Sequence, residues 1–304
     1  MGEAMNALSR RTFLQGSAAA LATASAFGQD SPAAWKVGGF TKVLQDLSYE
    51  KTAETAAEIG WDGIECPVRA KGHVLPERVD EDLPRMMEAL KAKNLENLVL
   101  ATDIKGADEP LTAKVLKAAV KAGVRLYRLG GLKYKEGVPI PKQLAEFRAR
   151  MTDLAALNKE LGVTGLYQNH SGNGYVGAAI WDIHELVKDF DPKHIGVHFD
   201  IGHATAEQGL SWPTAFKLVQ DRVGAVIVKD FYWKHAPGEG GKAQWCGIGK
   251  GSVNPKFFDL LRASGFRGPI TMQFEYPVEG DGLDPKIKAM KEDNRVLRGW
   301  LKSR

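Results

Sequence analysis

Three side chains that could bind a metal ion or move a proton lie within six positions, in the sequence GVHFDIGH at residues 196–203. They are His198, Asp200 and His203. The residues around them form a short apolar run, as in a buried strand. Because side chains two apart on a strand face the same side, His198 and Asp200 are expected to point into one site. The pattern predicts a strand that ends at a site for proton transfer or metal binding.

The elements that must position these residues alternate along the chain. Short apolar or alternating runs predict eight strands, at residues 35–41, 61–65, 98–103, 124–129, 163–169, 195–200, 223–229 and 269–274. Apolar spacings of three and four predict eight helices, at residues 49–59, 83–93, 112–122, 143–161, 181–189, 214–221, 257–263 and 285–301. This alternation predicts an α/β fold with a single (β/α)₈ TIM barrel over residues 30–304. A doubly wound open sheet is the main alternative, but no G-x-G-x-x-G follows the first strand.

Residues 1–29 are predicted to be an export signal and a short linker. Arg10-Arg11 precede a mildly apolar stretch that ends in Ala24-Ser25-Ala26, which is typical of a twin-arginine signal with its cleavage site. The stretch is too short and too weakly apolar to be a stable membrane anchor. We therefore expect the twin-arginine export machinery as a partner and a periplasmic or secreted mature protein that begins at Phe27.

Composition excludes some classes of function. The formal net charge is only +4, from 41 basic and 37 acidic residues, and no basic stripe interleaved with aromatic residues is present. Nucleic-acid binding is therefore not expected. The two cysteines, Cys66 and Cys246, are too few for a disulfide framework.

The barrel prediction indicates where the chemistry lies, because TIM-barrel enzymes work at the carboxyl ends of their strands. Nearly every predicted strand ends on a charged or hydrogen-bonding residue. These residues are Lys42, Glu65, Asp103, Arg128, Gln168-Asn169-His170, Asp200 with His203, Lys229-Asp230 and Glu275-Tyr276. Solvation of strand ends explains some of them singly, but it explains the whole set of acids and imidazoles poorly.

Five motifs at these strand ends resemble a known family. They are Gly60-Trp61-Asp62-Gly63-Ile64-Glu65, Gln168-Asn169-His170-Ser171-Gly172, Asp200-Ile201-Gly202-His203, Val228-Lys229-Asp230 and Phe274-Glu275-Tyr276, in that order. Together they resemble the xylose-isomerase-like TIM barrels, a family of sugar isomerases, epimerases and related lyases that is related to endonuclease IV. The resemblance covers essentially the whole mature chain, but it does not specify a substrate.

The resemblance also implies a metal site, which this chain alters. Epimerases of the family hold a divalent ion with Glu, Asp, His and Glu at strand ends. The matching positions here are Gln168, Asp200, Ile227 and Glu275, so two of the four ligands are replaced. Hard divalent ions favour carboxylates, and affinity should fall. His198, which faces the same way as Asp200, could compensate, so that Asp200, Glu275, His198 and Gln168 would still suit Mn²⁺, Mg²⁺, Zn²⁺ or Co²⁺.

The same positions suggest catalytic and substrate-binding residues. In the resembling family the histidine that matches His203 touches the substrate's oxygens. The predicted substrate-binding residues are His203, His170, Asn169, Arg128, His73 and Lys42, and the predicted catalytic residues are Glu275, Lys229 and Glu65. Arg128 could bind an oxyanion or phosphate, or could pair with Asp103.

Aromatic residues near the strand ends favour a sugar, because flat rings pack against the C–H faces of pyranoses. They are Tyr134, Tyr167, Trp212, Phe231, Tyr232, Trp233 and Trp245. Residues 234–251 contain six glycines and are predicted to form a mobile lid.

These features predict an exported enzyme that acts on a small-molecule sugar, a keto-sugar or keto-glycoside, by enolisation. The outcome would be epimerisation, isomerisation or elimination, with a metal or Lys229 stabilising the enediolate. The alternative is a non-catalytic periplasmic sugar-binding protein, which the replacements at Gln168 and Ile227 favour. DNA repair of the endonuclease IV type is not expected, because that site needs more histidine and acidic ligands.

Overall fold

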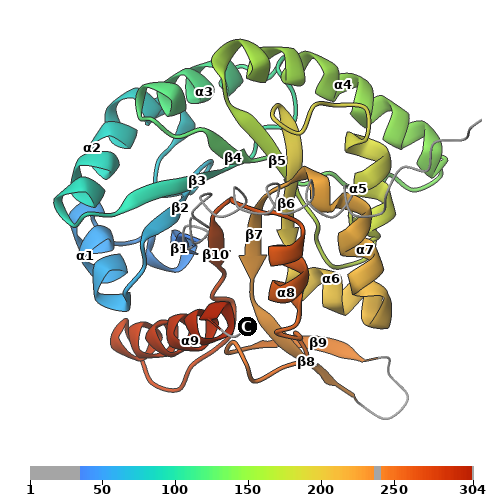
Figure 1. The fold of residues 1–304 in the computed structure, drawn as a ribbon. Helices are drawn as coiled ribbons and strands as arrows, with labels where there is room; N and C mark the ends of the chain where they lie inside the picture. The colour runs from blue at the N-terminus through green and yellow to red at the C-terminus, as the bar shows by residue number, and fades with distance from the viewer. Residues whose placement is uncertain (1–34, 236–240, 303–304) are drawn as a thin grey trace, which may run out of the picture. The chain divides into compact units, whose positions relative to one another are not determined.

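Eight parallel strands close into a barrel, in the order β1-β10-β7-β6-β5-β4-β3-β2 (Figure 1). A computed structural model of the chain describes residues 35–235 and 241–302. The barrel strands are β1 (Val37–Phe40), β2 (Gly63–Val68), β3 (Glu96–Thr102), β4 (Leu126–Arg128), β5 (Thr164–Gln168), β6 (Ile195–Asp200), β7 (Val223–Val228) and β10 (Ile270–Met272). The predicted single (β/α)₈ TIM barrel is confirmed.

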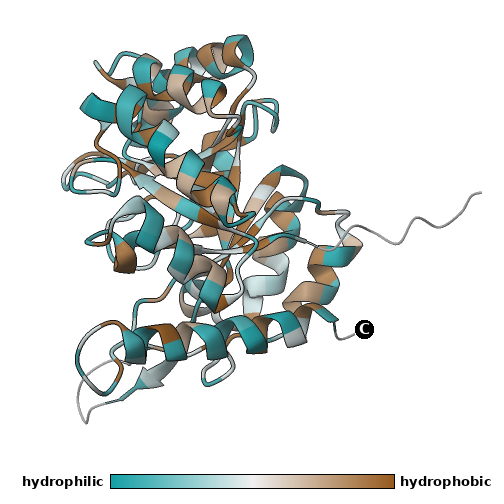
Figure 2. Cartoon of the chain, turned by 90° about the vertical axis from the view of Figure 1, so that its left-hand side faces the viewer, coloured by the Kyte–Doolittle hydropathy of each residue, from teal (hydrophilic) through white to brown (hydrophobic). Residues whose placement is uncertain are grey.

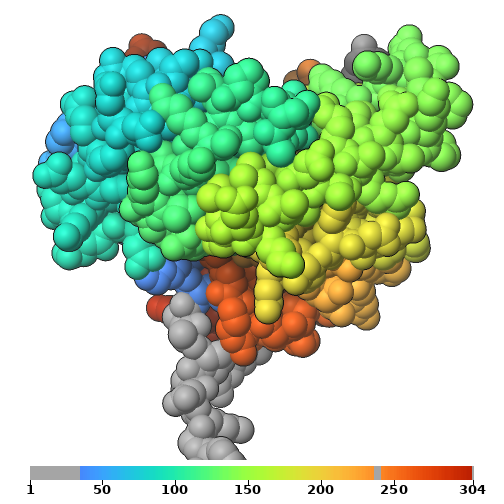
Figure 3. All heavy atoms as spheres, turned by 90° about the horizontal axis from the view of Figure 1, so that it is seen from above, coloured from blue at the N-terminus to red at the C-terminus, as the bar shows by residue number. Residues whose placement is uncertain are grey.

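The helices surround the barrel and cover its outer face (Figure 1). They are α1 (Tyr49–Ile59), α2 (Val79–Ala92), α3 (Thr112–Lys121), α4 (Ile140–Leu161), α5 (Ile180–Val187), α6 (Ile201–Gln208), α7 (Trp212–Val219), α8 (Phe257–Ala263) and α9 (Asp284–Lys302). Figure 2 shows both hydrophilic and hydrophobic residues along these helices, as expected where one face packs on a sheet and the other meets water. In Figure 3 the segments that carry α2, α3 and α4 form a continuous surface. No helix in the described ranges is long and apolar enough to cross a membrane.

Local chemistry explains several of the predicted boundaries. Helix α1 begins after Ser48, whose hydroxyl accepts the backbone N–H of Lys51, and it ends at Gly60 with φ of 86°. Gly39 lies inside β1 because the Trp61 ring packs against it, 2.1 Å from where a Cβ would be. Gly39 is therefore needed for close packing of β1 against Trp61. It is not part of a phosphate-binding glycine loop, as the alternative open sheet would have.

Strand β2 is longer than predicted, and this changes the site. It runs to Val68, three residues beyond the predicted end at Glu65. Glu65 consequently lies inside the barrel and is fully buried, while Arg69 occupies the position just after the strand. Pro67 is one reason for the error, because proline within a run argues against a strand.

One helix and one two-stranded hairpin were not predicted. Helix α6 follows β6 directly, and the Asp200 carboxylate accepts the backbone N–H of His203 at 3.0 Å to cap it. Strand β8 (Asp230–Lys234), which ends where the predicted lid begins, and strand β9 (Lys242–Cys246), which lies inside it, form an antiparallel hairpin. The Asp230 carboxylate fixes the segment after this hairpin by accepting the N–H groups of Gly249, Gly251 and Val253. This part of the predicted lid is therefore anchored to the barrel.

The structure bears on the two cysteines but not on the predicted export signal. The predicted export signal, residues 1–29, lies outside the described residues. Cys66 and Cys246 are both free thiols. Burial raises the pKa of Cys66 to about 12, so this thiol stays protonated in the core.

Candidate active site

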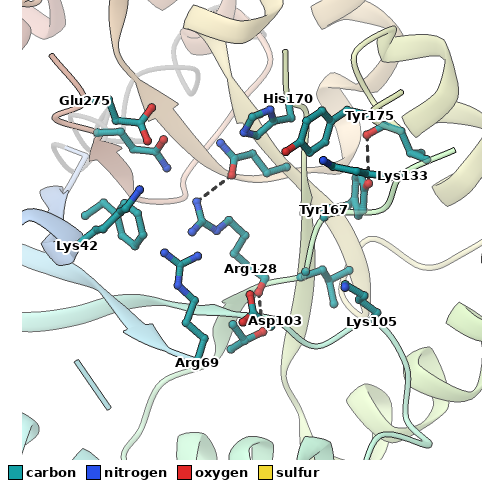
Figure 4. Close-up of a pocket in the computed structure, with 18 residues that line it drawn as sticks. Lys42, Arg69, Asp103, Lys105, Arg128, Lys133, Tyr167, His170, Tyr175 and Glu275 are labelled. Carbon is teal, nitrogen blue, oxygen red and sulfur yellow. Dashed lines mark hydrogen bonds between the residues drawn. The ribbon is translucent and has the colours of Figure 1, made fainter. Parts of the chain in front are cut away.

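A polar cavity of about 320 Å³ opens at the carboxyl ends of the barrel strands (Figure 4). This volume lies at the lower end of the range, roughly 300–1,000 Å³, that small-molecule sites have. Its walls come from β1 to β5 and from the segment after β10. The lining residues that bear charge or an imidazole are Lys42, Arg69, Asp103, Lys105, Arg128, Lys133, His170 and Glu275. The predicted rim is therefore the place where a small ligand can bind.

The acid–base centre beside this cavity is organised around the ammonium of Lys229. Its Nζ donates to Glu275 Oε2 at 2.8 Å and to Gln273 Oε1 at 3.0 Å, and it lies 3.4 Å from Asp200 Oδ2. Lys229 is only 3% exposed, and its Nζ lies 4.6 Å from the centroid of the Trp245 ring, which belongs to β9. A buried cation in this position offsets the charge of the two carboxylates around it.

Both the backbone and the side chain of Asp200 form hydrogen bonds with residues at the end of β5. Its backbone N–H donates to Asn169 Oδ1 at 2.7 Å, and its carbonyl accepts Asn169 Nδ2 at 2.8 Å. Gln168 Nε2 donates to Asp200 Oδ2 at 3.0 Å. Asn169, predicted to bind substrate, is 1% exposed and instead ties the end of β5 to the end of β6.

A second chain of contacts runs from Gln168 to the barrel interior. Arg128 Nη1 donates to Gln168 Oε1 at 2.8 Å and lies 3.3 Å from Glu65 Oε1. Thr271 Oγ1 donates to Glu65 Oε2 at 2.8 Å. Because a guanidinium can only donate, the amide oxygen of Gln168 must face Arg128 and its NH₂ group must face Asp200. A glutamate at position 168 could not donate to Asp200 in this way while ionised.

The imidazoles above the centre have defined hydrogen-bond roles. The backbone N–H of Ser171 donates to His203 Nδ1 at 3.2 Å, so the proton of the neutral ring lies on Nε2. That Nε2 is buried 3.6 Å from Asp200 Oδ2 and has no hydrogen-bond partner among the described residues. His170 donates through Nδ1 to the carbonyl of Ser171 and stacks on Tyr175 with ring centroids 4.4 Å apart. His170 lines the cavity, whereas His203 lies behind it.

Burial and neighbouring charges set the protonation states. Burial alone would raise the pKa of Glu275, but the charge of Lys229 and its hydrogen bond outweigh this, and the pKa lies below the ordinary 4.5. Burial, with the like charge of Lys229 next, lowers the pKa of His203 well below 6.5. Burial and the charge of Arg128 lower the pKa of His198 to about 3. At neutral pH the centre therefore holds an ionised Glu275 and two neutral imidazoles.

The predicted metal ligands do not fit a divalent ion. Lys229 donates to Glu275 and also contacts Asp200, so a cation already lies between these two carboxylates. The amide NH₂ of Gln168 faces Asp200, whereas a metal ligand would present its oxygen. His198 lies under the charge of Arg128, which also opposes a second cation there. Within the described ranges no group of three or more His, Cys, Asp or Glu side chains is placed to hold a metal.

Ile227 stands where the resemblance implies a histidine ligand, and it is fully buried. It pairs in register with Asp200 on β6 and with Thr271 on β10. Its hydrocarbon side chain supplies no donor atom at this level of the barrel. Lys229, two residues further along the same chain, brings the positive charge to the centre instead.

Some of the other predicted residues line the cavity, and others are buried in the barrel below or beside it. Lys42, Arg128, His170 and Glu275 line the cavity, as predicted for residues that meet a ligand. Glu65 does not reach the cavity; it is a buried partner of Arg128 and Thr271. His73 is also absent from the lining, because its ring nitrogens contact the hydroxyls of Thr41 and Thr52 and the carbonyl of Leu47. These contacts make His73 a packing residue between the first strand's loop and α1.

The predicted aromatic residues also separate into two groups. Tyr167 lines the cavity, and its hydroxyl accepts the N–H of Leu132 and donates to the carbonyl of Val176. Trp245 covers Lys229 and His203. Trp212 and Phe231 are buried in packing, and Tyr232 and Trp233 are exposed on β8. Tyr134 is half-buried and does not line the cavity, so of the seven residues only Tyr167 is placed to meet a ligand there.

Several lining residues were missed by sequence reasoning. They are Phe40, Arg69, Lys105, Lys133, Tyr175 and Gln273. Gln273 could have been found, since it lies two residues before Glu275 and so shares its face of the strand. Arg69 was missed because the end of β2 was placed at Glu65.

Comparison with known proteins identifies the family. The family model described as Xylose isomerase-like TIM barrel matches residues 53–300. The chain therefore belongs to the xylose isomerase-like TIM barrel family. No curated protein matches the chain in a sequence search.

Solved structures share the fold at low sequence identity. The apo form of 3-keto-D-glucoside 4-epimerase from E. coli is 14% identical, with a TM-score of 0.67 over 87% of this chain and 99% of that chain. An L-ribulose 3-epimerase is 15% identical, with a TM-score of 0.67 over 88% of this chain and 95% of that chain. A xylose isomerase-like protein from Mycobacterium smegmatis, in complex with magnesium, is 13% identical, with a TM-score of 0.66 over 88% and 96%.

Proposed function

We propose that this protein is a sugar isomerase, epimerase or related lyase that enolises a keto-sugar or keto-glycoside. The observation that carries the proposal is the pair formed by Glu275 and Lys229. A carboxylate whose side chain is 30% exposed faces a small polar cavity, and a buried ammonium 2.8 Å behind it holds its pKa down. Family membership and the sugar epimerases among the structures of the same fold support this reading.

In the proposed reaction Glu275 is the base. It removes the proton from the carbon next to the substrate's carbonyl, and the electron pair of the broken C–H bond forms a C=C bond while the carbonyl oxygen gains negative charge. That oxygen takes a hydrogen bond from Lys229 in place of the longest of its present contacts, the one to Asp200 at 3.4 Å. Return of a proton to the other face, or to the neighbouring carbon, gives the epimer or the isomer.

The surrounding residues hold this pair in place. Asp200 and Gln273 fix Lys229 from two sides, and Asn169 and Gln168 fix Asp200. Neutral His203 lies behind the cavity with its Nε2 3.6 Å from Asp200 Oδ2, so it supports Asp200 rather than meeting the substrate. Trp245 excludes water above the ammonium, which strengthens its interaction with a developing oxyanion.

One observation favours a sugar-binding protein without catalysis. Lys229 is 3% exposed under Trp245, and its contacts with Gln273, Glu275 and Asp200 already use its hydrogens. In a receptor these groups would simply form the floor of the site.

Hydrogen exchange separates the two functions. Enolisation in D₂O places deuterium on the carbon beside the carbonyl of a ketose or keto-glycoside, which NMR detects even when net turnover is slight. We expect exchange with the wild type and a loss of about 10²- to 10⁴-fold in Glu275→Gln, the usual contribution of a general base. Thermal unfolding and circular dichroism of Glu275→Gln control for folding. Saturable binding of a ketose panel with no exchange above the Glu275→Gln background would instead establish a receptor.

A further inference from the structure

The cavity carries an excess of positive charge. Five cationic side chains and two carboxylates line it, an excess of three positive charges. The cations are Lys42, Arg69, Lys105, Arg128 and Lys133, which follow or end strands β1 to β4. Figure 4 shows Arg69 and Lys105 across the cavity from Glu275 and His170.

Two of these cations share one aromatic ring. The guanidinium carbon of Arg128 lies 4.7 Å from the centroid of the Phe40 ring, and that of Arg69 lies 5.4 Å from it. Arg128 has partners in Glu65 and Gln168. Arg69, which is half-buried, forms no side-chain hydrogen bond and no ion pair within 4.0 Å in the part of the chain that the structure describes.

This arrangement is unfavourable without a ligand. Two guanidinium groups beside one ring repel each other, and the half-buried Arg69 has lost water without gaining an ion pair among the described residues; the more distant Asp103, Glu65 and Glu275 offset this only in part. Burial and the charge of Arg128 both lower the pKa of Arg69. The carboxylate of Asp103 lies on the same side but is exposed and forms no ion pair among the described residues. An anionic group bound here would relieve the repulsion.

Resting on the proposed function, we propose that the substrate is an acidic sugar whose carboxylate or phosphate binds to Arg69, in a cavity that Lys42 and Lys105 also line. The planar guanidinium matches the two oxygens of either group in a bidentate contact. The acidic end of the sugar then lies toward β2 and β3, and its carbonyl end lies toward Glu275. Glu275 is thereby kept away from the anionic group, whose negative charge would oppose proton removal.

The test compares three ketoses that differ only at carbon 6. These are D-fructose, D-fructuronate and D-fructose 6-phosphate, with inorganic phosphate as a minimal anion. Titration calorimetry at low salt should show at least one acidic ketose binding tenfold or more tightly than D-fructose. Raising the salt to 0.5 M should reduce this preference, because screening weakens charge interactions at a solvated site. The two acidic probes distinguish a carboxylate from a phosphate substrate.

Arg69→Gln should weaken the acidic ketose by about 10- to 100-fold, the usual worth of a hydrogen bond to a charged group, and leave D-fructose within twofold. Arg69→Lys should retain part of the preference. Arg295→Gln is the matched control, because it removes the same charge from a side chain that is 72% exposed on α9. It should leave all affinities unchanged.

Equal binding of all three ketoses would overturn the inference, as would a preference that survives in Arg69→Gln. Absence of saturable binding for both acidic ketoses and for inorganic phosphate would also overturn it. The proposed function is scored separately by exchange in D₂O. Exchange with neutral ketoses alone would support the proposed enzyme activity and contradict the acidic substrate. Tight binding of an acidic ketose without exchange would support the anion site and contradict the enzyme activity.

Discussion

The two halves of the barrel rim differ in whether their charged side chains form ion pairs. After β5, β6, β7 and β10, the charges compensate each other, as Lys229 does with Asp200 and Glu275. After β1 to β3, Arg69 and Lys42 have no ion pair within 4.0 Å among the described residues. The first half is complete without a ligand, whereas the second half gains from one. On the proposed function, the compensated half would perform the chemistry and the other half would select the substrate.

The contrast also explains why sequence motifs revealed the compensated half more fully than the other. Residues in the compensated half belong to short motifs, such as Val228-Lys229-Asp230 and Asp200-Ile201-Gly202-His203. In the other half the cations are spread over separate loops, and only the closed barrel brings them together.

The largest expected effect is on stability, from Lys229→Met. Removing the ammonium leaves Asp200 buried beside Glu275 with no cation between them. Loss of one member of a buried charge pair typically costs about 3–5 kcal/mol, and we expect the free energy of unfolding to fall by that amount. Urea unfolding at pH 7 measures it.

The matched change on the other half of the rim is Arg69→Gln. It removes a charge without an ion partner, so the free energy of unfolding should stay within about 0.5 kcal/mol of the wild type. If both variants lost similar stability, the distinction between a compensated and an uncompensated half would be wrong.

The fold could be predicted from sequence because its signals are local. Apolar runs and apolar spacings of three and four located most barrel elements. What failed depended on tertiary context. Helix α6 has a weak apolar pattern and begins where Asp200 caps it, and the β8–β9 segment contains many glycines and lysines that favour a loop reading. The extent of β2 depended on its pairing with β3, through Cys66–Leu100 to Val68–Thr102.

The candidate site was predictable to the level of strand ends and no further. Which side chains meet a ligand depends on how far along its strand each one lies. Because the end of β2 was predicted three residues too early, Glu65 was predicted in the site where Arg69 lies. The choice between metal and lysine also needed distances. Sequence showed that two ligands were replaced, and the structure shows the Lys229 ammonium between Asp200 and Glu275.

A smaller effect, on the pH dependence of stability, is expected from His198→Leu. His198 is buried in β6, two residues before Asp200. Both ring nitrogens of His198 are buried and have no hydrogen-bond partner in the part of the chain that the structure describes, and the pKa of about 3 lies below the ordinary 6.5. Because the unfolded chain takes up this proton more readily, stability is present above pH 6.5 and is lost as the pH falls toward 3. Leucine removes this dependence.

Between pH 7.5 and 4.5 the loss of unfolding free energy should therefore be smaller in His198→Leu than in the wild type, by about 2 kcal/mol. Urea unfolding at the two pH values provides the comparison, and all other titrating groups are common to both proteins. An equal loss in both proteins would mean that His198 is paired or protonated in the native state.

The smallest expected effect is that of a chelator. Since Lys229 contacts both predicted carboxylate ligands and Gln168 turns its NH₂ toward Asp200, the compensated half has its cation built into the chain. Dialysis against EDTA should therefore change the deuterium exchange rate by less than twofold, and added Mn²⁺, Mg²⁺, Zn²⁺ or Co²⁺ should not raise it. Elemental analysis of untagged protein provides a second measurement that does not depend on turnover. A stoichiometric metal that is lost with EDTA, together with the exchange, would show that Lys229 moves aside for the ion. The compensated half would then need a ligand as much as the other half does, and the contrast between them would disappear.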